Sequence, residues 1–128
     1  MIREIKSSDW PAFFQRLSEQ RAGAVVKLET IDPDGIRSEP VTSAEFQSML
    51  FSNTDACNGL IILRLKTNAM IVHEILDPFR IILHPADDTG DFNQLQINAE
   101  NGVTILTLHP AIHAQMLKDW ALKGIGTA

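Results

Sequence analysis

The chain has 128 residues, of which 45% are hydrophobic and 21% charged, and its formal net charge is −5. This composition is typical of an ordinary folded globular protein and not of a disordered one. The excess of acidic residues makes nucleic acid an unlikely partner, because phosphates repel a negative surface. We expect one domain that spans residues 1–128.

Several features point to a reducing compartment away from membranes. Cys57 is the only cysteine, so no intramolecular disulfide can form. The segment Met1–Lys6 lacks the apolar run of a signal peptide. The apolar run Leu60–Leu63 is far shorter than the roughly 20 residues that cross a bilayer. We therefore expect a cytoplasmic protein with no membrane partner.

The N-terminal region has the pattern of an amphipathic helix. Trp10, Phe13, Phe14 and Leu17 recur at helical spacing and form one apolar stripe. Capping residues precede this stripe, and Gly23 follows it at a position typical of a helix end. The pattern predicts a helix over residues 8–22 whose aromatic stripe faces the core.

The next segment alternates like a hairpin. Residues 24–31 and 36–41 form two predicted strands, and the sequence Asp32-Pro33-Asp34-Gly35 is typical of the turn between them. Pro40 places the end of the second strand at a sheet edge, because proline cannot donate a ladder hydrogen bond. Thr42–Glu45 resembles a capping box, and Phe46, Met49 and Leu50 follow at helical spacing. This pattern predicts a short helix over residues 43–51.

The middle of the chain is rich in strand patterns. Leu60–Lys66 begins with a continuous apolar run, which indicates a central strand buried on both faces. Thr67-Asn68 turns the chain into a second strand, Met70–Leu76. Asp77-Pro78 ends this strand, and residues 79–84 alternate as a third.

A hairpin centred on Asn101-Gly102 is the strongest local signal in the sequence. Both residues tolerate the positive φ of a type I′ turn. This turn would pair Ala99 with Thr104, Ile97 with Leu106, and Leu95 with Leu108, which places an apolar row on one face. Gly102 is expected to have a positive φ. The fold class is therefore α+β: a curved antiparallel sheet or small barrel with an N-terminal helix and a C-terminal helix packed on it.

A last helix is predicted to run from Pro110 to Lys123. One stripe of this helix carries apolar side chains, namely Ile112, Met116, Leu117 and Trp120. The stripe either covers the sheet or meets a second copy of the chain, since most homo-oligomers are two-fold dimers. These four residues are thus candidates for a homodimer interface centred on Trp120.

The chain resembles a family of short, uncharacterised bacterial proteins that share a domain of unknown function. The matching patterns are Ile5-x4-Trp10-x2-Phe13, His73-x-Ile75-x2-Pro78-x-x-Ile81 and Leu95-x-Ile97-x4-Gly102-x2-Ile105-Leu106. The resemblance covers residues 2–108, whereas residues 41–59 and the helix after Pro110 depart from the family. It implies a compact cytosolic domain, and it assigns no catalytic residue.

Little in the sequence points to catalysis. His109 and His113 are four residues apart, but Pro110 separates them from a common helix and no acidic ligand has the right spacing, so no metal site is expected. The acidic residues Asp87, Asp88 and Asp91 do not have the spacing of a calcium loop. Cys57 has no neighbouring base, and no nucleophile-elbow or nucleotide-loop motif is present. We expect no catalytic residue and no cofactor.

His73 is the weak candidate for a ligand-binding residue. It shares one strand face with Ile71 and Ile75, where most histidines are ordinary core or rim residues. A pocket in the concave face of the sheet would make His73 its first polar group. The sequence favours a non-catalytic interaction or accessory module with an unidentified protein partner. The alternatives are a small-molecule binding protein with a pocket between sheet and helices and an Sm-like nucleic-acid binder.

Overall fold

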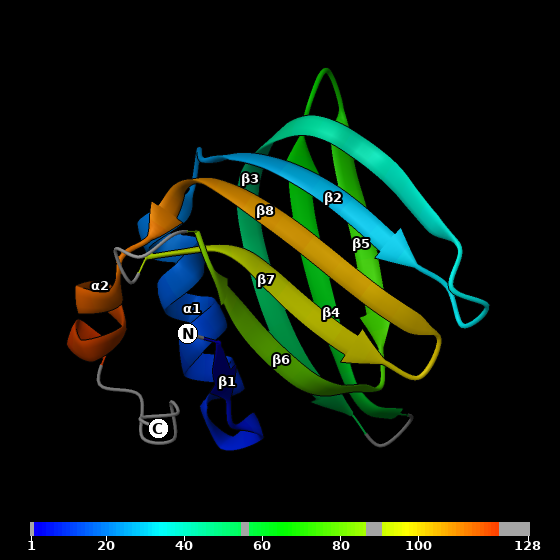
Figure 1. Ribbon diagram of the computed structural model, residues 1–128, viewed down its shortest axis with the longest axis horizontal. Helices are drawn as coiled ribbons and strands as arrows, with labels where there is room; N and C mark the ends of the chain where they lie inside the picture. The colour runs from blue at the N-terminus through cyan, green and yellow to red at the C-terminus, as the bar shows by residue number, and fades with distance from the viewer. Residues whose placement is uncertain (1, 55–56, 87–90, 121–128) are drawn as a thin grey trace.

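The computed structural model describes residues 2–54, 57–86 and 91–120 of the chain. Its elements are β1 (Arg3–Ile5), the 3-10 turn η1 (Ser7–Asp9), α1 (Trp10–Arg21), β2 (Val25–Ile31), β3 (Arg37–Thr54), β4 (Cys57–Lys66), β5 (Met70–Leu76), β6 (Pro78–Pro85), β7 (Phe92–Ala99), β8 (Gly102–Ile112) and α2 (Ala114–Asp119). The eight strands form one antiparallel sheet in the order β1-β6-β7-β8-β2-β3-β4-β5 (Figure 1). The predicted α+β class is confirmed. A closed barrel is not formed, because the described parts of β1 and β5 are unpaired edges at opposite ends of the sheet.

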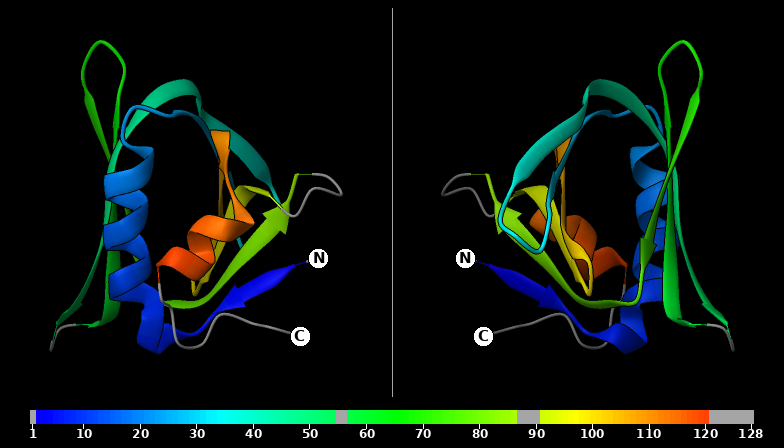
Figure 2. Two further views of the ribbon diagram at one scale, coloured as in Figure 1. Left: turned by 90° about the vertical axis from the view of Figure 1, so that its left-hand side faces the viewer. Right: turned by 90° about the vertical axis from the view of Figure 1, so that its right-hand side faces the viewer.

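The sheet bends around α1, and the long strand β3 carries the bend (Figure 2). The first half of β3, from Arg37 to Glu45, pairs with β2. The second half, from Glu45 to Thr54, pairs with β4. One strand therefore belongs to both halves of the sheet, and the two halves face each other across the helix.

The predicted aromatic stripe of α1 is confirmed as core. Phe13, Phe14 and Leu17 are completely buried, and the indole N–H of Trp10 donates to the carbonyl of Ile5 at 2.9 Å. The hydroxyl of Ser18 donates to the carbonyl of Met49 at 3.0 Å and accepts from its N–H at 2.9 Å. Because β2 no longer accompanies this part of β3, α1 satisfies backbone groups that a neighbouring strand would otherwise bind.

The short helix predicted over residues 43–51 is wrong, since this segment belongs to β3. Four register shifts interrupt its pairing, two against β2 and two against β4. The shift between Val41 and Ala44 and the shift between Phe46 and Ser48 each insert an extra residue into β3. The buried side chains there are therefore spaced by three: Val41 and Ala44, then Phe46 and Met49. This spacing imitates a helical period, which explains the error. The predicted edge position of Pro40 is confirmed, because residues 37–44 have a strand neighbour on one side alone.

The β7–β8 hairpin forms with a register different from the predicted one. Ala99 pairs with Gly102, Ile97 with Thr104, and Leu95 with Leu106, so the two turn residues are Glu100 and Asn101. Gly102 has the expected positive φ, at 134°, but Asn101 does not adopt the positive φ of a type I′ turn. The shift is two residues, which preserves the apolar face because the side-chain period is two.

The predicted C-terminal helix is also wrong over its first residues. Strand β8 continues through Pro110 to Ile112, which pairs with Phe92. The guanidinium of Arg21 holds this end by donating to the carbonyl of Ala111 at 2.8 and 3.2 Å. Only Ala114–Asp119 is helical, and residues 121–123 of the predicted helix lie outside the described residues.

Candidate functional site

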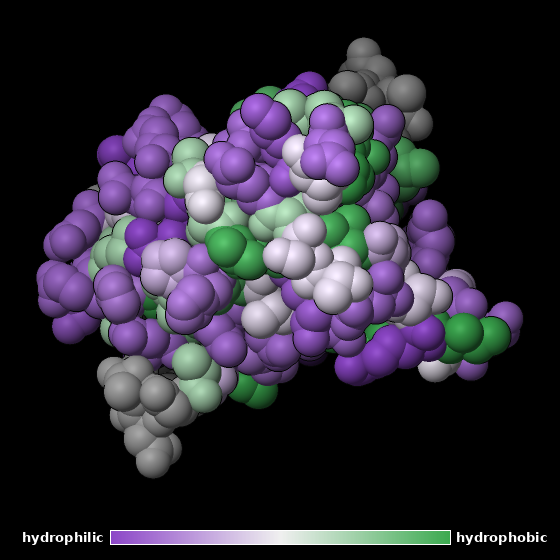
Figure 3. Space-filling model, turned by 90° about the horizontal axis from the view of Figure 1, so that it is seen from above, coloured by the Kyte–Doolittle hydropathy of each residue, from purple (hydrophilic) through white to green (hydrophobic). Residues whose placement is uncertain are grey.

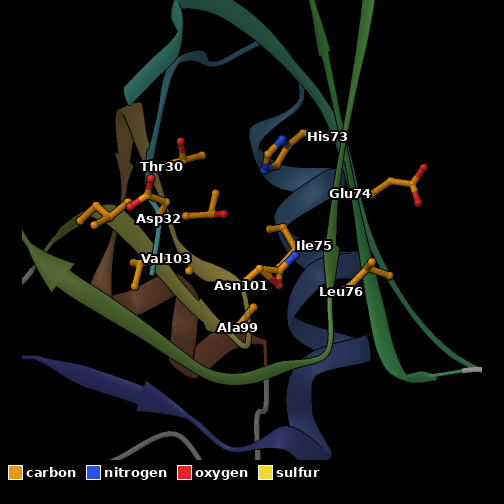
Figure 4. Close-up of a pocket in the computed structure, with 12 residues that line it drawn as sticks. Thr30, Asp32, His73, Glu74, Ile75, Leu76, Ala99, Asn101 and Val103 are labelled. Carbon is orange, nitrogen blue, oxygen red and sulfur yellow. The ribbon is translucent and has the colours of Figure 1, made fainter. Parts of the chain in front are cut away.

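A pocket of about 180 Å³ opens between β5 and the opposite half of the sheet (Figure 4). One wall is the C-terminal half of β5, with His73 and Ile75 directed into the space and Glu74 and Leu76 directed away from it. The other wall combines the end of β2 with the β7–β8 hairpin; its lining residues are Thr30, Ile31, Asp32, Ala99, Asn101, Gly102, Val103 and Thr104. Strands β2 and β5 and the β7–β8 hairpin, which are far apart in sequence, thus meet around this pocket.

His73 is the most distinctive polar group of this pocket. It lies on the same face as Ile71 and Ile75, as predicted, and it is half-buried. Burial lowers the pKa of the His73 imidazole below its ordinary value of 6.5. No hydrogen bond or ion pair joins this ring to another described side chain. The ring is therefore a neutral group with one donor and one acceptor nitrogen at neutral pH.

The other polar candidates do not assemble into a catalytic or metal site. Nδ1 of His113 lies 3.0 Å from the carboxylate of Asp91, whereas His109 lines an open surface hollow together with Arg21. No group of three or more metal-ligating side chains occurs in the described part of the chain. The carboxylate of Asp32 accepts hydrogen bonds from the N–H groups of Asp34 and Ile36, as its predicted turn role requires. Asp87 and Asp88 lie outside the described residues, and Cys57 begins β4.

The four residues proposed for a homodimer interface belong to the core. Ile112 is completely buried, Leu117 and Trp120 are about 5% exposed, and Met116 is partly buried against them. The ring of Trp120 meets that of Phe13 edge-on at 5.8 Å. This apolar stripe is therefore packed within the chain, where Trp120 contacts Phe13 of α1.

Apolar surface is exposed elsewhere, on the outer face of β3, β4 and β5. The predicted burial of β4 on both faces is wrong: Ile61, Leu63 and Leu65 are buried, but the residues between them are not. The outer apolar residues form what we call the outer patch, consisting of Leu50, Leu60, Ile62, Met70, Val72 and Leu76. Met70, Val72 and Leu76 are each 46–53% exposed.

Strand β5 is also a free edge of the sheet, and its sequence has few of the features that protect such edges. Natural edge strands are usually kept from pairing by short length, proline, charges or bulges. The edge strand β1 has just three residues, and the free side of β3 carries Pro40. In contrast, β5 has seven residues, no proline, a regular register with β4, and Glu74 as its only formally charged residue. Figure 2 (right) shows this edge uncovered by any other element.

Several basic side chains of the described chain form ion pairs with carboxylates. Lys27 and Arg37 contact Glu29 at 3.5 and 3.3 Å, and Arg80 pairs with Glu4. The end of the molecule drawn at the top of Figure 1 is mostly hydrophilic, with separate apolar residues among the polar ones (Figure 3). The basic groups named here are thus balanced locally by carboxylates.

Sequence reasoning identified His73 but missed the outer patch. The signal was present, because Leu60–Leu63 and most of Met70–Leu76 are apolar at successive positions, which gives both faces apolar side chains. In Leu60–Lys66 such a pattern predicts burial on both faces, whereas the second face is exposed.

No described helix has the length and apolar character needed to cross a membrane. Comparisons with protein-family models, curated proteins and solved structures gave no match.

Proposed function

We propose that the chain is a non-catalytic interaction module that binds an extended polypeptide strand along β5. The observation that carries this proposal is the unprotected edge of β5 next to the outer patch. A strand added to this edge would satisfy the free N–H and C=O groups, and alternate side chains would pack beside Met70, Val72 and Leu76 at the border of the patch. Every second side chain of the added strand would lie on the same face as the outer patch. The edge would therefore favour partners that have apolar residues at alternate positions.

The size of the pocket supports an interaction module over a small-molecule binding protein. Sites for drug-sized ligands have volumes of roughly 300–1,000 Å³ and enclose most of the ligand. The pocket beside His73 has about 180 Å³ and lies within the sheet rather than between sheet and helices. The hollow of about 400 Å³ at the end of α1 is more open to solvent and would enclose a ligand poorly. The net charge of −5 and the local pairing of basic residues also make an Sm-like nucleic-acid binder the weaker alternative.

A selection from a displayed library of short unstructured peptides tests this function. We expect the selected peptides to alternate apolar residues and to slow hydrogen exchange of the backbone amides in Met70–Leu76. The variant Val72→Glu should lose this binding, because it places a charge in the outer patch. Ile36→Glu is the matched control, since Ile36 is 62% exposed but lies in the β2–β3 turn. Peptides that protect other amides, or a library without binders at concentrations where the chain is monomeric, would contradict the proposal.

A second candidate function is the binding of a very small polar molecule beside His73. The free imidazole on the pocket wall favours it, since half-buried polar groups normally have partners. The ligand class is a neutral molecule of a few non-hydrogen atoms that can donate to or accept from the ring. Nuclear magnetic resonance titration with a fragment library would test this. Coupled shifts of the His73 ring and the Asn101 amide are expected, and their absence across the library would exclude this candidate.

A further inference from the structure

The structure contains a strand edge that is complementary to itself. In antiparallel pairing, residues directly opposite each other lie on the same face of the sheet. A second copy of β5 can therefore pair with the first if the two-fold axis, perpendicular to the sheet, passes between a residue and its own counterpart. An axis at His73, the middle residue of Met70–Leu76, pairs all seven residues of the strand. Met70 then lies opposite the partner's Leu76, and Val72 lies opposite the partner's Glu74.

We propose that the occupant of the β5 edge is a second copy of this chain, which forms a two-fold dimer through antiparallel β5–β5 pairing centred on His73. This inference rests on the proposed function of β5 as a binding edge and names its partner. It also moves the expected homodimer interface away from Trp120, whose side chain is already buried.

The side chains on the outer face fit this arrangement. The two end pairs join Met70 to the partner's Leu76, which extends the outer patch of one chain into that of the other. Within one chain Arg64 lies opposite Val72. The partner's Glu74 therefore stands two strand spacings from Arg64, about 10 Å between Cα atoms, which two long side chains of opposite charge can span. An axis at Glu74 would place like charges directly opposite each other, and an axis at Val72 would leave Leu76 outside the strand pairing.

The inner face fits as well. Ile71 would lie opposite the partner's Ile75, and both are apolar residues beside the core. The two His73 rings would meet at the axis, next to the pocket of each chain. Because burial leaves these rings neutral, one can donate to the other without repulsion between like charges.

Charge reversal at a single position tests both the dimer and its register. We expect analytical ultracentrifugation of the wild-type chain at micromolar concentration to give twice the chain mass. Val72→Glu would place a carboxylate opposite the partner's Glu74, twice in each dimer, and should produce monomers. Val72→Lys would place a cation at the same position and should keep the dimer. An Ile36→Glu control should also remain dimeric, and circular dichroism would verify that every variant is folded.

A cross-link provides the second measurement. In a Cys57→Ser background, His73→Cys places two thiols at the two-fold axis, where opposite Cα atoms lie about 4.5–5.5 Å apart and can form a disulfide. Mild oxidation should yield covalent dimers of His73→Cys but not of Ile36→Cys. A wild-type monomer at every soluble concentration, or a dimer that tolerates Val72→Glu, would overturn the inference. A monomer that still binds selected peptides along β5 would leave the proposed function standing and would remove only the self-pairing.

Discussion

Gly102 supports the junction between β8 and β2, and its replacement by alanine should be strongly destabilising. The residue has a φ of +134°, which side-chain-bearing residues rarely adopt. A Cβ atom there would lie 2.3 Å from the carbonyl oxygen of Ile31 and 3.3 Å from Cα of Asp32. The carbonyl belongs to the paired backbone of β2, where Ile31 lies opposite Val103, so it cannot rotate away as a flexible side chain would.

Gly35 offers a control that separates the two contributions. Its φ is +84°, but an added Cβ would meet no atom within 4 Å. Gly35→Ala should therefore cost about 1–2 kcal/mol for the backbone conformation alone. Gly102→Ala adds the overlap with Ile31, which costs about 1–3 kcal/mol by analogy with overpacked sites, so its total is about 2–5 kcal/mol. This is a large part of a typical domain stability of about 5–15 kcal/mol.

Urea unfolding followed by tryptophan fluorescence measures both values. We expect the midpoint of Gly102→Ala to fall well below that of Gly35→Ala, with similar slopes for the two variants. Equal losses would refute the reasoning, because they would mean that the backbone of β2 does not approach Gly102 as closely as described. If Gly35→Ala alone strongly lowered the free energy of unfolding, the sensitive site would be the β2–β3 turn and not the β2–β8 junction.

Three further perturbations test the core, the helix docking and the pocket. Phe13→Ala should lower the free energy of unfolding by about 3–5 kcal/mol, because Phe13 is completely buried against Phe14 and Trp120; an unchanged urea midpoint would contradict its place in the core. Ser18→Ala should cost about 1–3 kcal/mol by the same measurement, because it leaves the N–H and C=O of Met49 without the hydroxyl; a neutral effect would mean that water replaces it fully. The lowered pKa of His73 means that the unfolded chain binds the proton more readily, so stability should fall as the pH drops below 6.5 and be unaffected above it. His73→Asn should remove that part of the pH dependence, and an unchanged profile would exclude His73 as its source.

Local chemistry in the sequence determined several elements of this protein. The aromatic stripe of α1 was predictable because helical spacing places every fourth residue on one face, and all four of its members are buried. The Asp32–Gly35 turn was predictable because Asp32 binds backbone groups two and four residues later, which needs no distant partner. The inward position of His73 followed from the two-residue period of β5.

The tertiary structure alone decided the path of β3, the hairpin register and the site. Bulges in β3 depend on pairing with β2 and β4, so its three-residue spacing could not be distinguished from a helical one in sequence. In the observed hairpin register Gly102 lies against the backbone of Ile31, and β8 pairs with β2, neither of which a local turn preference contains. Apolar residues in β4 and β5 were evident, but the exposure of their outer face depends on which elements pack over the sheet. Helix α1 lies on the concave side, so no described element covers the outer patch or the free edge of β5.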